Sequence, residues 1–160
     1  MVRQGRLTVA REEGFVVLLI GARANHWWNL PIGWAVARAM TRMVGELLSD
    51  PDAGLLSYES YFGRTTLMVQ YWRSIEDLHR YAQAPKREHG SAWRAWIKNW
   101  GKGAVGIWHE TYIVEPGSYE CVYVHMPEFG LGQVGPLVPA TGPLKTSEGR
   151  IRAGAWRHQS

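Results

Sequence analysis

Two of the six histidines in this 160-residue sequence stand where an imidazole could do chemistry. His109 lies in the middle of Gly106–Val114, where apolar, aromatic and β-branched residues predict a strand. Side chains alternate along a strand, so His109 shares one largely apolar face with Ile107, Thr111 and Ile113. Such a histidine is either a hydrogen-bonded core residue or a proton-transfer group, because imidazole titrates near neutral pH.

The second histidine, His89, opens the aromatic face of a helix predicted over residues 87–100. The face consists of residues at helical spacing: His89, Trp93, Trp96, Ile97 and Trp100. If this helix packs on the strand that carries His109, both histidines line one apolar slot, one from each wall.

A slot of this kind suits a flat hydrophobic cofactor such as haem b. Haem iron takes an axial imidazole, and the ring takes apolar and aromatic walls with a polar group on the distal side. His89 is the candidate iron ligand, Trp93 and Trp96 the candidate walls, and His109 the candidate distal acid/base. The alternative is an aromatic core that holds two hydrogen-bonded histidines, and spacing alone leaves both open. The sequence has no zinc, phosphate-loop or nucleophile-elbow motif.

The elements that must position these histidines follow from hydrophobic periodicity and turn residues. The apolar run over residues 15–21 predicts a buried strand, and Pro31 begins a helix that ends near Pro51. Ser74 and Asp77 have the form of a capping box and begin another short helix. The remaining strands are predicted as two hairpins: 54–62 with 65–72, and 106–114 with 119–126.

This order of strands and helices resembles a ferredoxin-like split βαβ unit, an α+β fold with an antiparallel sheet. Because the helices cover one face of the sheet, the other face needs a cover, and a second subunit is the simplest one. We therefore expect a homodimeric α+β barrel. Residues 1–13 are expected to be a loose arm, 14–126 the domain, and 127–160 an extended tail rich in proline and glycine.

Composition narrows the classes of partner. Hydrophobic residues make up 46% of the chain, which is ordinary for a globular protein. The net charge of +4 is scattered and argues against nucleic acid, and no apolar run is long enough to span a membrane. The single cysteine, Cys121, excludes an internal disulfide and fits the reducing cytoplasm. A small molecule is the expected partner.

Several blocks of the sequence resemble the DUF4188 group, which is described as a monooxygenase family of dimeric α/β-barrel proteins. The resemblance covers roughly residues 14–135. The blocks are Gln70–Ser74, Glu76–Leu78, Tyr81-Ala82, His89 with Ala92-Trp93, Gly106–Tyr112, Tyr119–Tyr123, and Met126-Pro127 with Gly130–Gly132.

A more distant resemblance is to haem-containing aldoxime dehydratases. They carry in the same order a Trp-Arg-Ser block, a helix with the proximal histidine, and a His-Glu strand with the distal histidine. The resemblance implies that His89 is the proximal haem ligand and His109 the distal catalyst. Ser74 ends the Trp-Arg-Ser block, but its place before a helix indicates a cap and not a catalytic role.

Three functions are consistent with the sequence. The first is a haem-dependent lyase or monooxygenase that acts on a small apolar substrate with an N–O or oxidisable bond, with Thr111 or Glu120 orienting His109. The second is a cofactor-free monooxygenase or cyclase with His109 as its base. The third is a non-catalytic ligand-binding dimer.

Overall fold

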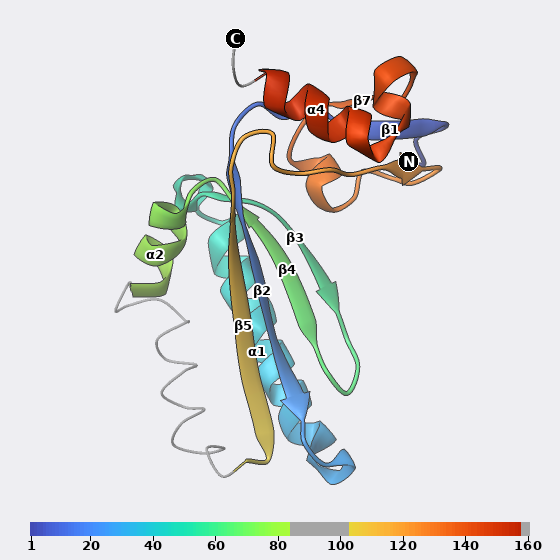
Figure 1. Ribbon diagram of the computed structural model, residues 1–160. Helices are drawn as coiled ribbons and strands as arrows, with labels where there is room; N and C mark the ends of the chain where they lie inside the picture. The colour runs from blue at the N-terminus through green and yellow to red at the C-terminus, as the bar shows by residue number, and fades with distance from the viewer. Residues whose placement is uncertain (84–102, 158–160) are drawn as a thin grey trace.

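The computed structural model describes residues 1–83 and 103–157, apart from the side chains of 29–33, 35–37, 39 and 155–157. Its largest element is a four-stranded antiparallel sheet in the order β3-β4-β2-β5 (Figure 1). The strands are β2 (Phe15–Ala24), β3 (Leu55–Tyr61), β4 (Leu67–Trp72) and β5 (Val105–Val114). The predicted α+β, ferredoxin-like fold class is confirmed, and the strand expected around His109 is β5.

β2 is an inner strand, between β4 and β5, and its residues are apolar on both faces, as burial on both faces of a sheet requires. It pairs with β4 on one side and along its whole length with β5 on the other. The strand predicted over residues 15–21 is therefore confirmed and runs on to Ala24. β5 has only β2 as a neighbour, so it is an edge strand of this sheet within the described residues.

Two helices cover one face of the sheet, α1 (Leu30–Leu48) and α2 (Ile75–Gln83). Among the described side chains of α1, Met40, Val44 and Leu47 are buried and pack against the sheet. The helix predicted from Pro31 is confirmed. The helix predicted over residues 87–100 lies outside the described residues.

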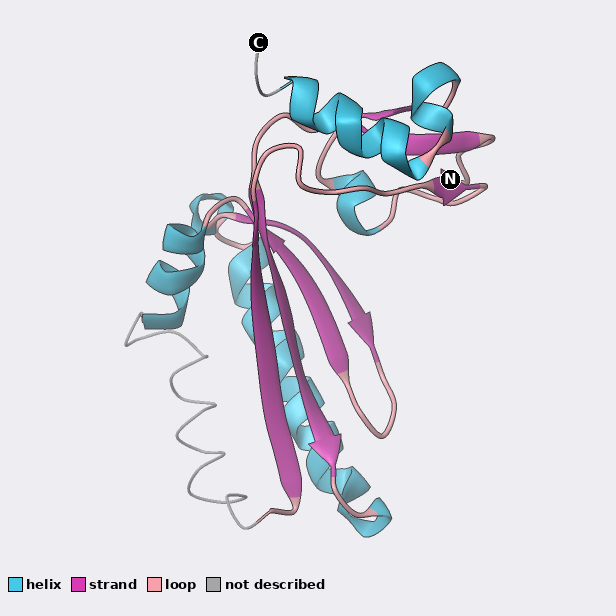
Figure 2. Cartoon of the chain, in the orientation of Figure 1, coloured by secondary structure: helices cyan, strands magenta, loops and turns pink. Residues whose placement is uncertain are grey.

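The two ends of the chain differ from expectation. β1 (Arg6–Val9) lies between β6 (Tyr123–Val124) and β7 (Leu137–Pro139) in a second antiparallel sheet, and α4 (Ser147–Arg157) belongs to the same part of the molecule (Figure 2). The expected hairpin of residues 106–114 with 119–126 is wrong, because β6 pairs with β1 and not with β5. The division at residues 13 and 126 stays a prediction, but this sheet joins β1 of the arm and β7 of the tail to β6, which lies within residues 14–126.

Short 3-10 helices connect the larger elements. They are η1 (Trp27–Asn29), η2 (Pro51–Ala53), η3 (Gly130–Gln133) and η4 (Gly142–Lys145). No helix among the described residues is both long enough and apolar enough to cross a bilayer.

The second sheet covers one end of the sheet face that α1 and α2 leave open. Phe15 and Tyr71 pack there against Leu131, Tyr119 and Tyr123. Further along the same face Tyr61 and Tyr112 are 44% and 50% exposed.

Candidate functional site

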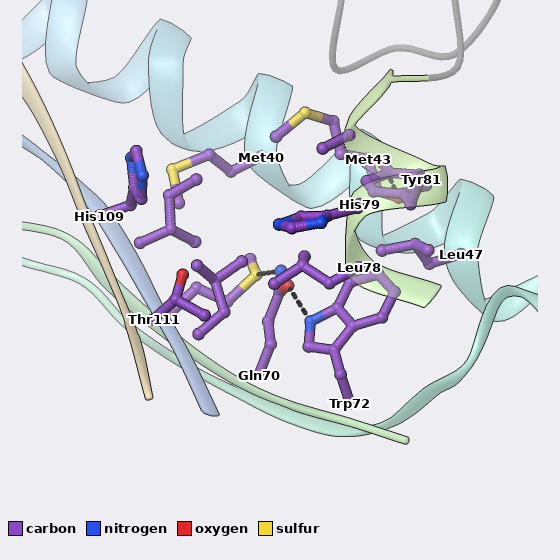
Figure 3. A pocket seen from close by; sticks show the side chains of 14 residues that line it. Met40, Met43, Leu47, Gln70, Trp72, Leu78, His79, Tyr81, His109 and Thr111 are labelled. Atoms are coloured by element: carbon purple, nitrogen blue, oxygen red, sulfur yellow. Dashed lines mark hydrogen bonds between the residues drawn. The ribbon is translucent and has the colours of Figure 1, made fainter. Parts of the chain in front are cut away.

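A cavity of about 220 Å³ lies between the large sheet and the two helices that cover it (Figure 3). It is the space in which β5 presents His109 to α1 and α2. Its described lining comprises Leu18, Ile20, Met40, Met43, Leu47, Met68, Gln70, Trp72, Leu78, His79, Tyr81, Ala82, His109 and Thr111.

The cavity wall is mostly apolar, with three methionines among its residues: Met40, Met43 and Met68. Thioether side chains are flexible and polarisable, so they adapt to ligands of irregular shape. Small-molecule sites typically combine such walls with a few polar groups that fix orientation. The arrangement therefore suits a small, largely apolar ligand.

His109 stands at the sheet edge of this cavity, in register with Ile20 on β2. Thr111 lines the same cavity, as strand alternation predicts, and both residues are exposed. In the part of the chain that the structure describes, the imidazole makes no hydrogen bond.

The acidic residues near His109 in the sequence do not reach it. The Glu110 carboxylate accepts a hydrogen bond of 2.5 Å from the Tyr112 hydroxyl, which raises the pKa of Tyr112. Glu120 pairs with the buried Arg150 beside the second sheet. Of the two residues expected to orient His109, Thr111 lies in the cavity and Glu120 does not.

α2 is held in place at its first turn. The Asp77 backbone N–H donates to Ser74 Oγ at 3.1 Å, so the serine half of the predicted capping box is confirmed. The buried Asp77 carboxylate accepts from Arg73 Nε at 2.7 Å and from Arg80 at 2.5 Å, and these bonds lower its pKa. These contacts fix the helix that brings Leu78 and His79 to the cavity.

Comparison with known proteins decides the family. A profile of the family described as "Monooxygenase af470-like" matches residues 15–131, most of the chain. The chain belongs to this family. A curated relative, "Monooxygenase af470" of Aspergillus fumigatus, is 29% identical in an alignment of 172 positions, which covers 90% of this chain. The match spans 62% of the length of that relative. The expected likeness to a monooxygenase family is confirmed.

The fold extends to aldoxime dehydratases. A crystal structure of an aldoxime dehydratase with butyraldoxime matches 97% of this chain and 44% of its own, with a TM-score of 0.72 and 12% identity. A second aldoxime dehydratase matches 94% of this chain and 44% of its own, with a TM-score of 0.66 and 16% identity. The shared fold therefore includes the second sheet, of which β1 and β7 lie outside residues 14–126. At these identities the likeness concerns the fold.

The described cavity fits part of what haem b requires. Apolar side chains suit the ring, and the imidazoles of His79 and His109 are of the donor type that iron takes. No Lys or Arg is among the described lining residues to pair with the propionates. The predicted ligand His89 and the predicted walls Trp93 and Trp96 lie outside the described residues. The described residues also hold no cluster of three or more His, Cys, Asp or Glu side chains that could bind a metal ion.

Sequence patterns did not identify two polar residues of the cavity as candidate site residues, Gln70 and His79. Gln70 lies between Met68 and Trp72 on one face of β4, the same signal of a polar residue in an apolar strand face that singled out His109. His79 follows Leu78 in α2, one position outside the apolar stripe. A helix that borders a cavity also exposes to it residues beside its apolar face, and hydrophobic periodicity alone does not identify such residues.

Proposed function

We propose that this protein is an enzyme that acts on a small, largely apolar organic substrate in the cavity between the sheet and α1 and α2. The observation that supports this most directly is the imidazole of His109, which has no hydrogen-bond partner among the described residues, at the edge of a cavity with otherwise mostly apolar walls. The family likeness to a monooxygenase and the shared fold with aldoxime dehydratases are consistent with it.

Different residues of the cavity would bind the substrate, transfer the proton and orient the substrate. The methionine, leucine and isoleucine side chains bind the apolar part of the substrate and exclude water. His109 gives or takes a proton at a ring nitrogen, and positioned acid/base groups of this kind contribute about 10²- to 10⁴-fold to a rate. Thr111, two residues along β5, orients the polar end of the substrate.

In the fuller form of the proposal the cofactor is haem b. His89 would hold the iron, as the resemblance to haem-containing aldoxime dehydratases implies, and Trp93 and Trp96, which share its predicted helix face, would supply aromatic walls for the ring. Bound haem would supply a Lewis-acidic and redox-active iron, which suits a substrate with an N–O or oxidisable bond. His109 is then the distal acid/base.

An absorption titration tests this form. Wild-type protein, His89→Ala and His79→Ala are titrated with haem, and the Soret band is followed. We expect wild type and His79→Ala to develop the band and His89→Ala to lack it. His79→Ala is the matched control because it also removes one imidazole. Loss of the band in His79→Ala with retention in His89→Ala would move the ligand to α2.

A cofactor-free monooxygenase or cyclase is the second candidate. It is favoured because the described cavity lining already combines apolar walls with a histidine, which is what such an enzyme needs. His109 is the base in this case as well. If haem titration of wild type gives no Soret band, this candidate replaces the first. The cofactor-free activity is then measured as oxygen uptake with phenolic substrates, in wild type and in His109→Gln.

We also propose that the protein is a homodimer joined through the open face of the large sheet. On that face Leu19 and Val69 are paired neighbours, only half-buried, between the exposed Tyr61 and Tyr112. A second copy would cover this surface, as the fold class predicts. In the aldoxime dehydratases that share the fold, more than half of the chain lies outside the match. In those proteins the same sheet face could therefore be covered by another part of the same chain.

Light scattering coupled to size-exclusion chromatography measures the assembly. Wild type is expected at twice the chain mass of 18.1 kDa, and Val69→Lys at the mass of one chain. Glu148→Lys, a charge change at an exposed site on α4, is the control and should stay dimeric. A monomeric wild type would rule out the dimer.

A further inference from the structure

We propose that Gln70 is a specificity-determining residue, which donates a hydrogen bond from its side-chain amide to an acceptor atom of the bound substrate. Trp72 is its positioning residue. This inference rests on the proposed function, because it takes the cavity between the sheet and α1 and α2 as the substrate site. It adds that the substrate carries a lone-pair acceptor, such as a carbonyl or oxime group, on an otherwise apolar body.

The orientation of the Gln70 amide is set by Trp72. The Trp72 indole N–H donates to Gln70 Oε1 at 2.9 Å, and both side chains are buried (Figure 3). Trp72 is 0% exposed, so its indole N–H does not face bulk solvent. An indole nitrogen can only donate. A flipped amide would set two donors against each other, so the amide oxygen must face Trp72.

With the oxygen fixed, the amide NH₂ group has only one described acceptor. Gln70 Nε2 lies 3.1 Å from the sulfur of Met68, two residues back on the same strand face. A thioether is a weak acceptor, whereas an amide NH₂ carries two donor hydrogens. Donor capacity therefore remains, and leaving a buried donor without a good partner is unfavourable.

The place of this donor in the cavity gives it a role in binding. Gln70 lines the same cavity as His109 and Thr111, and it comes from β4 while they come from β5. A substrate acceptor that meets the amide is thereby held at a fixed place relative to the imidazole. A ligand of the same shape without an acceptor leaves the amide poorly paired, and such sites reject it.

A pair of probes of nearly equal shape tests the inference. Acetophenone has a carbonyl acceptor, and α-methylstyrene has a methylene group in its place. Kd is measured for both probes with wild type, Gln70→Met and Trp72→Phe. The amide signals of Gln70 in wild type are followed by ¹⁵N NMR during both titrations, so a readout remains if a variant does not fold.

We expect wild type to prefer acetophenone. In Gln70→Met that preference should fall by about 3- to 10-fold, the range that one neutral hydrogen bond supports. Trp72→Phe should reduce the preference as well, because it frees the amide to turn. In wild type, acetophenone but not α-methylstyrene should move the Gln70 amide signals downfield.

The outcomes separate this inference from the function on which it rests. If neither probe binds wild type and no cavity signal moves, the cavity is not a site for small apolar molecules and the proposed function fails. If both probes bind wild type but the preference is the same in Gln70→Met, the role of Gln70 is overturned and the proposed function stands. Equal movement of the Gln70 amide with both probes also overturns it.

Discussion

His109 on β5 lies in register with Ile20 on the central strand β2, so its imidazole stands on the sheet face that α1 and α2 cover. The next residue, Glu110, is in register with Leu19 and points to the opposite face. Two adjacent polar residues of one strand thus face different surroundings, a cavity on one side and the open sheet face on the other. Substitution of each in turn separates the two faces experimentally.

We predict that His109→Gln lowers kcat/KM by about 10²- to 10⁴-fold, since it removes a proton-transfer group while it keeps the shape of the side chain. Stability should change by less than about 0.5 kcal/mol, because the side chain is exposed. Turnover of butyraldoxime and of phenolic substrates, beside thermal unfolding, measures both. Glu110→Gln is the control and should retain turnover. Equal activity in the two variants would remove His109 from the mechanism.

Ser74→Ala should lower the free energy of unfolding by about 1 kcal/mol, because Ser74 Oγ accepts a hydrogen bond from the Asp77 backbone N–H in the first turn of α2. Activity of the remaining folded protein should be unchanged. Ser74→Asp supplies an equivalent acceptor and should restore stability, as measured by urea unfolding. A large loss of turnover in Ser74→Ala at full stability would instead give this serine a role in catalysis.

The strands of the large sheet could be predicted because each carries its own signal. The run over residues 15–21 is apolar on both faces, and the alternation around His109 marks one inward face of β5. The partner of β6 could not be predicted in this way. Alternation in Tyr119, Cys121 and Tyr123 shows that they share a face, and they pack against Val9 and Phe15. Periodicity identifies the face but not the strand to which it pairs.

The folded part of the tail escaped prediction for a related reason. Proline and glycine interrupt every period after Met126, and local pattern is all that a single sequence shows. What orders this region is distant in the sequence: Ala10 N–H donates to Pro136 O, and Arg150 pairs with Glu120. In the cavity, Gln70 carried a usable signal, whereas His79 became visible only once α2 was placed beside β5.

Asp77→Asn should destabilise the protein at neutral pH and not in acid. The Arg73 hydrogen bond, with a further bond from Arg80, lowers the pKa of Asp77 in the folded state. A lowered folded pKa means that the stabilisation is present above the unfolded value near 3.9, and is lost as pH falls from there through the folded pKa. We expect a loss of about 1 kcal/mol at pH 7, since solvent screens both guanidinium groups.

Thermal unfolding of wild type and Asp77→Asn between pH 2 and pH 8 measures this difference. It should be constant above about pH 5 and shrink as acid protonates the carboxylate. Glu148→Gln removes one partner of the Glu148–Arg152 pair, in which both side chains are more than 70% exposed, and should change stability little at any pH. A difference for Asp77→Asn that persists at the lowest pH would show that the carboxylate charge is not its source.

Gly21 and Gly45 form a matched pair that tests how closely β2 is packed. A Cβ on Gly21 would stand 2.1 Å from the carbonyl oxygen of Thr66 and 2.8 Å from Trp108 Nε1, while a Cβ on Gly45 would meet nothing within 4 Å. Gly21→Ala should therefore lower the free energy of unfolding by roughly 3 kcal/mol, because the backbone beside β4 must move. Gly45→Ala, at an exposed position within α1, should raise it by about 0.5–1 kcal/mol. Urea unfolding of both variants gives the comparison, and a Gly21→Ala protein as stable as wild type would contradict the close approach of β2 to Thr66.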